Sequence, residues 1–578
     1  MNAALSEERD GGMGRTVPVY QALAEDIARA GIDTIFGLMS DDTAVFATAL
    51  DSMGLGFHGA RHENNAIAMA EGYATASGRL GVAVIGRGPA TANGLHGAVY
   101  ASRTGAKVLI IYGEAALNPG AINTLGPDYK EFDAAAVLGA AGLKSFVATS
   151  PGAARSALAD AIAEAMLGRA AVLLLPTNVQ LAEIEVAADD APAPARKAAQ
   201  ETPAPRPARA QAIDATAALL DKSRKPLIIG GLGAHRAGAK AALESLAERI
   251  GGLLVTTARG KDMFRGHPYN LGIIGSFSHS AARRLIDQCD CVLVFGASLN
   301  FLTTSFGTSV PDAPLVQIDR VRGNIGRWCD ADVAVTGDAR LAAEQLLEAL
   351  PERAEADKPF HTADVRDSLA AFDLADDFQA APTARTVDPR SLGILLDELL
   401  PDNRSIVYDA GNFLGVLPYL SVPGPDHVKL TTDFASIGLG FGTALGFAKA
   451  RPEGTTVLVI GDGGFLMTMG ELETAAREDL PLIVVLMNDC AYGAELHLLR
   501  MQQLPVSKSV FPDVDFAPVA EAFGFRAATI RNLDDLRALA PMLKNPDGPI
   551  FLDCKINADI ASPFMGEFAA AEARADRG

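Results

Sequence analysis

Short runs of consecutive apolar residues recur along the whole chain and alternate with alanine-rich stretches. A strand that buries only one face alternates apolar and polar residues, so these unbroken runs predict strands buried on both faces. Strands of this kind with helices between them form parallel sheets from βαβ units. We therefore expect an α/β protein with three doubly wound parallel-sheet domains. The runs that support this prediction are residues 82–85, 108–111, 172–175, 226–229, 252–255, 291–295, 456–460, 482–486 and 550–552.

Two segments interrupt this alternation. Residues 186–208 are rich in alanine and proline, which is typical of an extended surface linker. Residues 353–385 are charged and weakly periodic. The predicted organisation is a first, N-terminal domain over 14–185, a linker over 186–208, a central domain over 209–352, a second linker over 353–385, a third domain over 386–560 and a tail over 561–578.

Composition excludes several classes of protein. The formal net charge is −20, whereas a nonspecific nucleic-acid binder needs a basic surface. No run reaches the roughly 18 apolar residues that a membrane helix needs. Residues 1–20 are polar and include acids, unlike a signal peptide. We expect a cytoplasmic protein that has neither a nucleic-acid nor a membrane partner.

A glycine-rich turn follows the buried run at residues 456–460. The turn is Gly461-Asp462-Gly463-Gly464, and residues 465–478 after it predict one helix with Met467 among its buried positions. Glycines allow a phosphate to approach the backbone, and a helix N-terminus offers free N–H groups and a positive dipole end. The turn is therefore a candidate phosphate site.

A second acid, Asp489, ends the next apolar run. The carboxyl ends of two neighbouring strands could bring Asp462 and Asp489 together as ligands of Mg²⁺, which prefers oxygen ligands and often bridges to a phosphate. The alternative is that the two acids only cap loops, because Gly-Asp-Gly is a short motif.

Residues 461–493 resemble the signature of thiamine-diphosphate enzymes, in the branch of acetohydroxyacid synthase, benzoylformate decarboxylase and 2-hydroxyacyl-CoA lyase. The resemblance implies thiamine diphosphate and Mg²⁺ as cofactors, a pyrimidine-binding first domain and a diphosphate-binding third domain. It also implies metal ligation by Asp462, Asp489 and the backbone carbonyl of Ala491. Asp489 replaces an asparagine of the family and keeps a hard oxygen ligand. The implied cofactor-binding residues are Gly461, Asp462, Gly463, Gly464, Asn412, Ile437, Asp489 and Tyr492.

Apolar residues recur at helical spacing within residues 61–74 and predict a helix. Glu63 lies at the start of this helix, where the helix dipole favours an anion. Taken alone, Glu63 could be an ordinary exposed acid. The segment resembles the family's catalytic one, which implies that Glu63 protonates the aminopyrimidine ring of the cofactor. Residues 434–442 resemble the family's turn in which an apolar residue bends the cofactor, and Ile437 falls there; its alternative is a plain core residue. Residues 88–93 also resemble a family loop.

The family resemblance implies a homodimer or homotetramer with active sites between subunits. In relatives the central domain binds FAD, a CoA-type nucleotide, or neither. The cluster Gly230-Gly231-Leu232-Gly233 is weak evidence for a nucleotide-binding site. Residues 296–304 lack the basic and acidic stretch of the flavin-dependent synthases, which argues against FAD.

The implied reaction is cleavage or formation of a carbon–carbon bond next to a carbonyl, through ylid and enamine intermediates, as in a 2-oxo acid decarboxylase, acyloin lyase or carboligase. The substrate is a small carbonyl compound. Alternatives are an acetolactate-synthase-like transferase, an FAD-dependent 2-oxo acid oxidase and a non-catalytic homologue. Leu498 stands near the position of a tryptophan in acetohydroxyacid synthases, which argues against acetolactate synthesis. Candidates for substrate contact are Asp41, Arg87, Glu114, Glu495 and His497, each of which could instead be a solvated charge.

Overall fold

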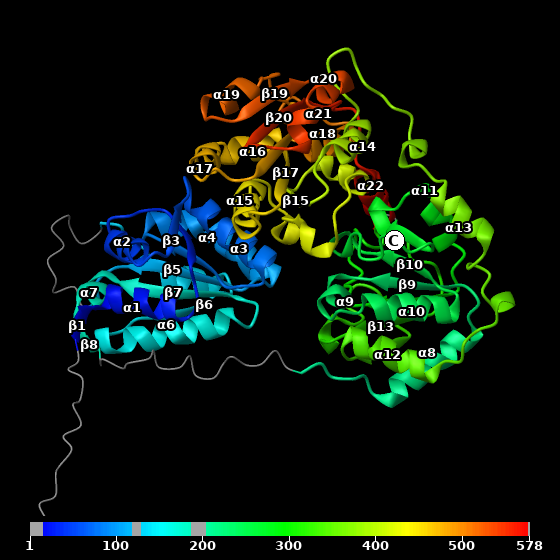
Figure 1. Ribbon diagram of the computed structural model, residues 1–578, viewed down its shortest axis with the longest axis horizontal. Helices are drawn as coiled ribbons and strands as arrows, with labels where there is room; N and C mark the ends of the chain where they lie inside the picture. The colour runs from blue at the N-terminus through cyan, green and yellow to red at the C-terminus, as the bar shows by residue number, and fades with distance from the viewer. Residues whose placement is uncertain (1–14, 118–128, 187–203, 576–578) are drawn as a thin grey trace, which may run out of the picture. The chain divides into compact units, whose positions relative to one another are not determined.

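The computed structural model describes residues 15–117, 129–186 and 204–575 (Figure 1). The chain forms two compact units. The first contains the N-terminal part of the chain together with two later segments, Phe441–Arg451 and Thr468–Leu480. The second contains the rest of the chain from Pro203 onward.

The first unit contains a six-stranded parallel sheet with the order β3-β2-β4-β5-β7-β6. Its strands are β2 (Thr34–Gly37), β3 (Gly56–Gly59), β4 (Gly81–Ile85), β5 (Val108–Glu114), β6 (Lys144–Val147) and β7 (Ala170–Pro176). A separate antiparallel pair joins β1 (Arg15–Pro18) to β8 (Glu183–Val186). The helices are α1 (Val19–Arg29), α2 (Ala44–Ser52), α3 (Glu63–Ser77), α4 (Pro89–Thr104), α5 (Ala134–Ala140), α6 (Pro151–Ala165) and α7 (Thr177–Leu181).

Two helices from later in the sequence complete the first unit, α15 (Gly440–Ala450) and α17 (Glu471–Arg477). Helix α3 packs closely against α15, and glycines make this possible. A Cβ atom at Gly72 would collide with the backbone of Thr443, and one at Gly446 would collide with the backbone of Met69. The glycines of residues 434–446 therefore serve helix packing as well as the turn.

The central sheet has six parallel strands in the order β11-β10-β9-β12-β13-β14. They are β9 (Pro226–Gly230), β10 (Leu253–Thr256), β11 (Asn270–Ile273), β12 (Cys291–Phe295), β13 (Leu315–Asp319) and β14 (Val333–Thr336). Counted within the domain, this is the 3-2-1-4-5-6 order of dinucleotide-binding sheets. Its helices are α8 (Ala210–Lys222), α9 (Leu232–Arg236), α10 (Lys240–Ile250), α11 (Ser280–Ile286) and α12 (Ala339–Ala349), with 3₁₀ turns η1 (Ala258–Gly260), η2 (Gly275–Phe277) and η3 (Arg322–Asn324).

A linking stretch carries η4 (Glu355–Asp357), α13 (Ala363–Ala370) and η5 (Leu374–Asp377) before the third sheet. The strands of that sheet run β16-β15-β17-β18-β20-β19 and are all parallel. They are β15 (Arg404–Tyr408), β16 (Val428–Leu430), β17 (Thr455–Gly461), β18 (Leu482–Asn488), β19 (Arg526–Ile530) and β20 (Ile550–Lys555). The first and third sheets share one strand order, 2-1-3-4-6-5 when counted within each domain.

The helices after the linking stretch are α14 (Pro389–Leu399), α16 (Asp462–Thr468), α18 (Gly493–Met501), α19 (Ala517–Ala522), α20 (Leu533–Ala538), α21 (Ala540–Lys544) and α22 (Pro563–Ala575), with 3₁₀ segments η6 (Asn412–Tyr419), η7 (Pro425–His427) and η8 (Thr432–Phe434). None of the helices in the described part of the chain combines the length and the apolar character of a membrane span.

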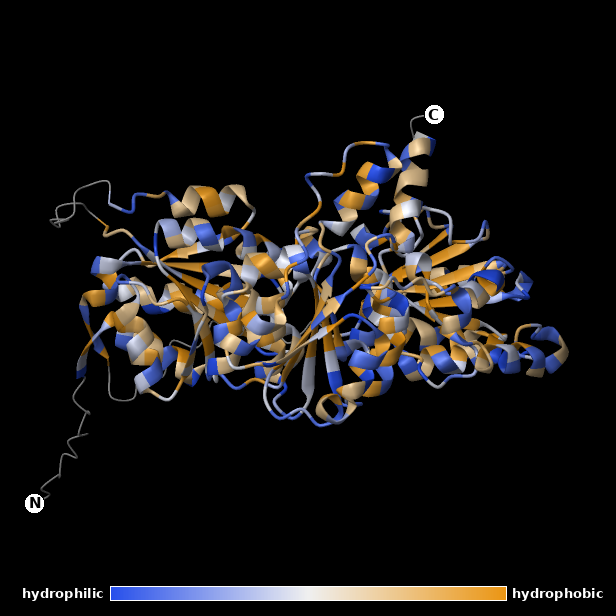
Figure 2. Cartoon of the chain, turned by 90° about the horizontal axis from the view of Figure 1, so that it is seen from above, coloured by the Kyte–Doolittle hydropathy of each residue, from blue (hydrophilic) through white to orange (hydrophobic). Residues whose placement is uncertain are grey.

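The predicted fold class is confirmed. Each predicted apolar run falls on a parallel strand, and the strands at the centre of each sheet are buried except at end residues such as Glu114 of β5 and Gly461 of β17. Figure 2 shows these strands as predominantly hydrophobic. The reason is the one that the sequence indicated: helices cover both faces of each sheet, so neither face of a central strand meets water.

One helix prediction was wrong. Residues 465–478 form two helices, because α16 ends at Thr468 and α17 begins only at Glu471. Gly470 lies at this break, and glycine is a poor helix former in water. Met467, predicted to be buried, is 59% exposed, whereas Phe465 on the same short helix is fully buried.

Candidate active site

Three acids follow three adjacent strands of the third sheet. Asp409 comes directly after β15, Asp462 directly after β17 and Asp489 directly after β18. Strand order reverses between β15 and β17, and ligands of open α/β sheets bind at the carboxyl ends of the strands beside such a reversal. The three side chains therefore lie at the place where this fold puts a ligand.

Asp462 and Asp489 interact directly with each other. Asp462 is only 3% exposed, and one of its oxygens accepts a hydrogen bond from the Gly463 N–H at 3.0 Å. Burial raises the pKa of Asp462. Burial and the neighbouring charge of Asp462 both raise the pKa of Asp489. Two acids this close cannot both ionise without a neutralising charge. A hard divalent cation supplies that charge, so the donor chemistry fits Mg²⁺.

The loop after Asp489 turns sharply. Cys490 has a left-handed backbone with φ of +56°, and the Ala491 N–H donates to the Asp489 carboxylate at 3.1 Å. Tyr492 then donates its N–H to the Ser509 carbonyl at 2.8 Å. The turn places Ala491, buried at 4% exposure, beside the two acids.

The glycines of the turn at 461–464 are required by close packing within the protein. A Cβ atom at Gly463 would lie 2.7 Å from the Tyr492 ring, and one at Gly464 would lie 2.5 Å from an oxygen of Asp409. One at Gly461 would lie 3.1 Å from the ring of Phe413. A larger residue at these positions would displace the side chains that form the site.

Asp409 is a site residue that the sequence reasoning missed. It is fully buried and accepts hydrogen bonds from the N–H groups of Gly438 (2.7 Å) and Gly440 (3.2 Å) and from the Thr431 hydroxyl (3.0 Å). Burial raises its pKa. It thereby holds the turn that carries Ile437. The signal was present, since Asp409 follows a buried strand as Asp462 and Asp489 do.

Ile437 and Asn412 lie in the same region. The Cβ of Ile437 is 3.6 Å from the Cβ position at Gly464, and Gly438 follows it with φ of +83°. Asn412 does not point freely at a ligand. Its amide nitrogen donates to the Ile560 carbonyl at 3.0 Å, and its oxygen accepts from the Ser562 N–H at 2.8 Å.

Glu63 lies in the first unit as the first residue of α3. It is 9% exposed, and the Asn93 amide donates to its carboxylate at 3.2 Å. The fully buried hydroxyl of Tyr112 has no hydrogen-bond partner in the part of the chain that the structure describes. Burial, and then the charge of Glu63, raises the pKa of this phenol. Asn93 lies in helix α4, within residues 88–93, which the sequence had suggested to be a loop.

A second buried acid positions the start of α3. Glu471, 1% exposed, accepts hydrogen bonds from the Arg61 N–H and from the Asn65 amide, both at 2.9 Å. The hydroxyl of Thr474 also donates to it at 2.7 Å. Burial raises its pKa. Glu471 thus binds the chain on both sides of Glu63, at Arg61 and at Asn65. The sequence reasoning missed this residue.

Two of the candidate substrate residues meet in a cluster at the carboxyl ends of β2 and β4. Lys130 pairs with Asp41, and this contact holds the pKa of Asp41 down to about 2. The neighbouring Asp42 is buried and accepts the Arg87 N–H at 2.7 Å. The Arg87 side chain donates to the Tyr129 carbonyl at 3.3 Å. Lys130 therefore neutralises the anion that was expected at Asp41, and Arg87 is engaged with a backbone carbonyl.

Glu114, at the end of β5, is half-buried, and burial raises its pKa. It caps the next residue, because the Ala115 N–H donates to it at 2.7 Å.

Glu495 and His497 lie on α18, directly after the loop that carries Asp489. His497 is buried, and burial lowers its pKa. Glu495 is exposed at the edge of an apolar cavity of about 390 Å³. The remaining lining residues of this cavity are Phe301, Phe306, Ala494, Leu498, Phe564, Met565 and Phe568.

The glycine cluster of the central domain, Gly230-Gly231-Leu232-Gly233, packs its backbone against the backbone of Phe295 and Gly296. The Gly231 N–H donates to the Phe295 carbonyl and the Gly233 N–H to the Gly296 carbonyl, both at 2.9 Å. A Cβ atom at Gly233 would lie 2.8 Å from Gly296. These two N–H groups are thus used internally, at the strand reversal where a nucleotide phosphate would bind.

Three family models match the chain in succession. They are the N-terminal thiamine-pyrophosphate-binding domain (residues 18–126), the central domain of thiamine pyrophosphate enzymes (213–346) and the C-terminal thiamine-pyrophosphate-binding domain (409–554). Together the matched segments cover more than half of the chain, and the two binding-domain models include Glu63 and the three acids of the third sheet.

Several curated proteins are similar over almost their whole length. A probable acetolactate synthase large subunit of Methanocaldococcus jannaschii is 26% identical, covering 94% of this chain and 93% of the relative. A probable 2-ketoarginine decarboxylase of Pseudomonas aeruginosa is 28% identical, covering 90% and 91%. A sulfoacetaldehyde acetyltransferase of Rhodobacter capsulatus is 26% identical, covering 94% and 95%. With its three matched domains and three parallel sheets, the chain belongs to the family of thiamine-pyrophosphate-dependent enzymes.

Proposed function

We propose that this protein uses thiamine diphosphate and Mg²⁺ to cleave or form a carbon–carbon bond next to a carbonyl group. The observation that carries the proposal is the buried pair of acids at the ends of β17 and β18. Burial raises the pKa of both acids, and the charge of Asp462 raises that of Asp489 further. A divalent cation between them would favour the ionised form of both. Such a cation would also attract the diphosphate of the cofactor.

The metal would be held by Asp462, Asp489 and the backbone carbonyl of Ala491. When bound, thiamine diphosphate supplies the carbanion chemistry of the reaction. Ile437, beside Gly464, would set the shape of the bound cofactor through van der Waals contact. Tyr492 stacks edge-on against Phe511 at 4.6 Å and would close the diphosphate end of the site.

Glu63 would hold a proton at the aminopyrimidine ring. Its surroundings support this role, because it is largely buried and contacts Asn93, an uncharged donor. Glu471 would keep the start of α3 in place while the proton moves. Glu471 is therefore a positioning residue, whereas Glu63 touches the cofactor in this proposal.

The substrate would carry an uncharged, apolar group next to its reacting carbonyl. This part of the proposal rests on the apolar cavity along α18, whose wall begins at Ala494, one residue beyond Gly493, which packs against Asp489. Among the lining residues Glu495 is the only charged side chain, so the cavity offers no cation to a second carboxylate. Leu498 and Phe568 would contact the apolar group.

The relatives named above differ in the fate of their substrates, since their names describe synthases, a transferase and a decarboxylase. The first step that we propose is cleavage next to the carbonyl, which all these outcomes could share. Product analysis would then separate release of an aldehyde from transfer to a second carbonyl compound.

We also propose a homodimer or homotetramer in which each active site draws Glu63 from one subunit and Asp462 from another. Mixing inactive Glu63→Gln and Asp462→Asn chains, with subunit exchange, would restore about a quarter of wild-type activity in a dimer of this symmetry. Sites contained in single chains would stay inactive in the mixture, which would contradict the shared site.

The first experiment is thermal unfolding of dialysed protein, with and without thiamine diphosphate plus Mg²⁺. A ligand that binds the folded state raises the midpoint by mass action. We expect a clear rise that requires both components, in a protein whose visible spectrum shows no flavin. No rise in protein proven free of cofactor would favour a non-catalytic homologue, and a yellow protein would favour the FAD-dependent oxidase.

A further inference from the structure

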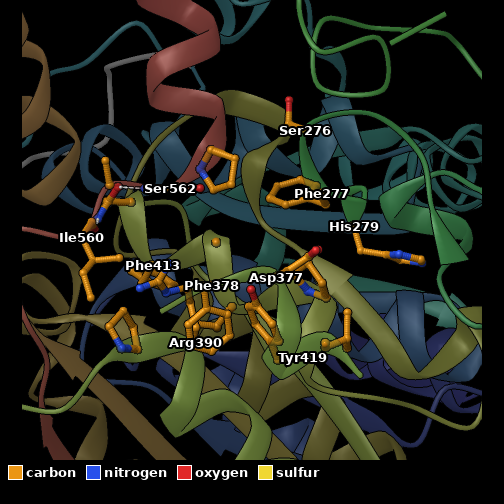
Figure 3. Close-up of a pocket in the computed structure, with 18 of the residues that line it drawn as sticks. Ser276, Phe277, His279, Asp377, Phe378, Arg390, Phe413, Tyr419, Ile560 and Ser562 are labelled. Carbon is orange, nitrogen blue, oxygen red and sulfur yellow. Dashed lines mark hydrogen bonds between the residues drawn. The ribbon is translucent and has the colours of Figure 1, made fainter. Parts of the chain in front are cut away.

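A cavity of about 170 Å³ lies in the second unit, where loops of the central domain meet the third domain (Figure 3). An apolar cavity of about 150 Å³ is large enough for benzene, so this one accepts a ring-sized molecule. Of its wall, only Asn412 was among the residues expected from the sequence to bind the cofactor. Figure 3 shows Ser562 and Ile560 on one side of the cavity and His279 and Asp377 on the other.

Three serine hydroxyls on this wall are buried and have no hydrogen-bond partner in the part of the chain that the structure describes. They belong to Ser276, Ser278 and Ser562, which are 1%, 9% and 4% exposed. Their backbones are firmly held, since the Ser278 N–H donates to Gly275 and the Ser562 N–H to Asn412. A buried hydroxyl without a partner is unfavourable, so a second molecule in the cavity would be stabilised by these groups.

The rest of the wall is mainly aromatic. Phe277, Phe378, Phe413 and Tyr419 line the cavity, and the rings of Phe378 and Tyr419 meet edge to face at 5.7 Å. Burial raises the pKa of Tyr419 to about 12, so its hydroxyl remains a neutral hydrogen-bonding group at all physiological pH values. The cavity therefore combines flat apolar surfaces with neutral hydroxyl groups.

Charged groups on the wall disfavour an anionic occupant. The Arg390 guanidinium donates to both oxygens of Asp388, at 3.0 and 2.7 Å, and lies 4.2 Å from the centre of the Phe378 ring. Arg390 is thus already neutralised by Asp388 and offers no free positive charge to an anion. An added anion would meet Asp377, whose carboxylate accepts only the N–H of Ser280 among the described residues.

We propose that this cavity binds a compact molecule without a negative charge, with an apolar ring or branched body and at least one hydroxyl, carbonyl or amide group. Ser278, from the central domain, and Ser562, from the C-terminal part of the chain, hydrogen-bond to its polar group. The aromatic rings of the wall enclose its apolar body.

The cavity is connected to the proposed metal site through Asn412. The side chain of Asn412 bonds to Ile560 and Ser562 on the cavity wall, and its Cβ is 3.1 Å from the Cβ position at Gly493, which also packs against Asp489. Occupancy of the cavity therefore changes the affinity for thiamine diphosphate and Mg²⁺, and by linkage the cofactor changes the affinity of the cavity to the same degree. This second part rests on the proposed function.

The test uses the full chain and four probes of one shape: benzyl alcohol, benzoate, benzylamine and toluene. Calorimetric titration measures their affinities, and a crystal structure with benzyl alcohol locates it. We expect benzyl alcohol to bind at least about tenfold more tightly than benzoate and toluene, because Asp377 repels benzoate and toluene leaves the hydroxyls without a partner. Ser278→Ala and Ser562→Ala should each weaken benzyl alcohol about two- to tenfold and leave toluene unchanged. Ser368→Ala, exposed on α13, is the control.

Ordered water alone in the cavity at saturating benzyl alcohol would overturn the proposal, as would equal binding of the four probes. Ser562→Phe, which would fill the space, should abolish binding; retained binding would place the probe elsewhere. Titration of thiamine diphosphate with Mg²⁺, with and without benzyl alcohol, tests the connection. An unchanged cofactor affinity would contradict the connection alone, whereas failure of the cofactor to bind at all would contradict the proposed function and leave the cavity site standing.

Discussion

The first and third sheets share one strand order but use their carboxyl ends differently. In the third sheet the acids after adjacent strands converge, and Asp462 and Asp489 face each other. In the first sheet the buried acid Asp42 bonds to the Arg87 N–H of a neighbouring loop, and Glu63 stands on a helix beside Asn93. The same topology thus brings two acids together in one domain and holds a single acid beside an amide in the other.

The difference lies in the number of acids and in what surrounds them. Two acids in contact repel each other when both are ionised, whereas Glu63 is a single acid that accepts a hydrogen bond from the Asn93 amide. Both arrangements depend on close backbone packing, through Gly463 and Gly464 in the third sheet and through Gly72 against Thr443 in the first unit. The variants below test whether the two regions have these different tasks.

Glu63→Gln should have the largest effect. The amide keeps the shape and the contact with Asn93 but cannot transfer a proton, so we expect kcat to fall by about 10²- to 10⁴-fold. Cofactor-induced thermal stabilisation should remain. Glu348→Gln, exposed on α12, is the control. Full turnover in Glu63→Gln would end the proposal that this carboxyl activates the cofactor.

Removing an acid of the pair should act on cofactor retention. We expect Asp489→Ala and Asp462→Ala to weaken Mg²⁺-dependent binding of thiamine diphosphate by at least about tenfold, measured by calorimetry. The pKa of both acids is raised, so protons compete with the metal, and Mg²⁺ affinity should fall as pH drops from about 8 to about 6. In Asp489→Asn one competing acid is gone, so this pH dependence should become shallower. Metal affinity independent of pH in the wild type would contradict ligation by this pair.

Glu471→Gln should have an intermediate effect on the first region only. Its carboxylate accepts hydrogen bonds on both sides of Glu63, and replacing it by an amide disturbs that acceptor pattern. We expect kcat to fall by about tenfold, with little change in KM and in Mg²⁺ affinity. A shift in the pH profile of kcat would accompany a displaced Glu63. Loss of stability with an unaltered kcat in the folded fraction would assign Glu471 a structural role alone.

Leu498→Ala should give the smallest effect and concerns the third domain. For straight-chain 2-oxo acids we expect kcat/KM to rise about fourfold with each added methylene that the apolar cavity buries. Leu498→Ala should flatten this dependence, and Leu499→Ala on the same helix, which is not part of the cavity wall, should not. A preference for dicarboxylic substrates would contradict the proposed substrate class.

Local sequence patterns predicted nine of the eighteen strands of the three parallel sheets, none of them an edge strand. Unbroken apolar runs such as 482–486 predicted β18 because burial on both faces leaves no polar position. The same reasoning failed for residues 465–478, where Met467 is apolar yet exposed. The predicted periodicity assumes one continuous helix, whereas the break at Gly470 separates the exposed Met467 on α16 from the buried Leu472 on α17.

Candidate acids were predictable where they follow a strand, as at Asp462 and Asp489. Asp409 follows a strand as well, and its role emerged only from its bonds to Gly438 and Gly440, far away along the chain. Lys130 and Glu471 carry no local pattern at all. Their partners, Asp41 and the start of α3, lie about 90 and 400 residues away in sequence.

The sequence by itself determined the fold class and the family, because strand periodicity, glycine turns and acids at strand ends are local features. The tertiary structure decided which of these groups meet: it joined Asp462 to Asp489, gave Asp41 a lysine and enclosed three serine hydroxyls in one cavity. Burial and charge contact depend on distance in space, and the fold brings together groups that are far apart in the sequence.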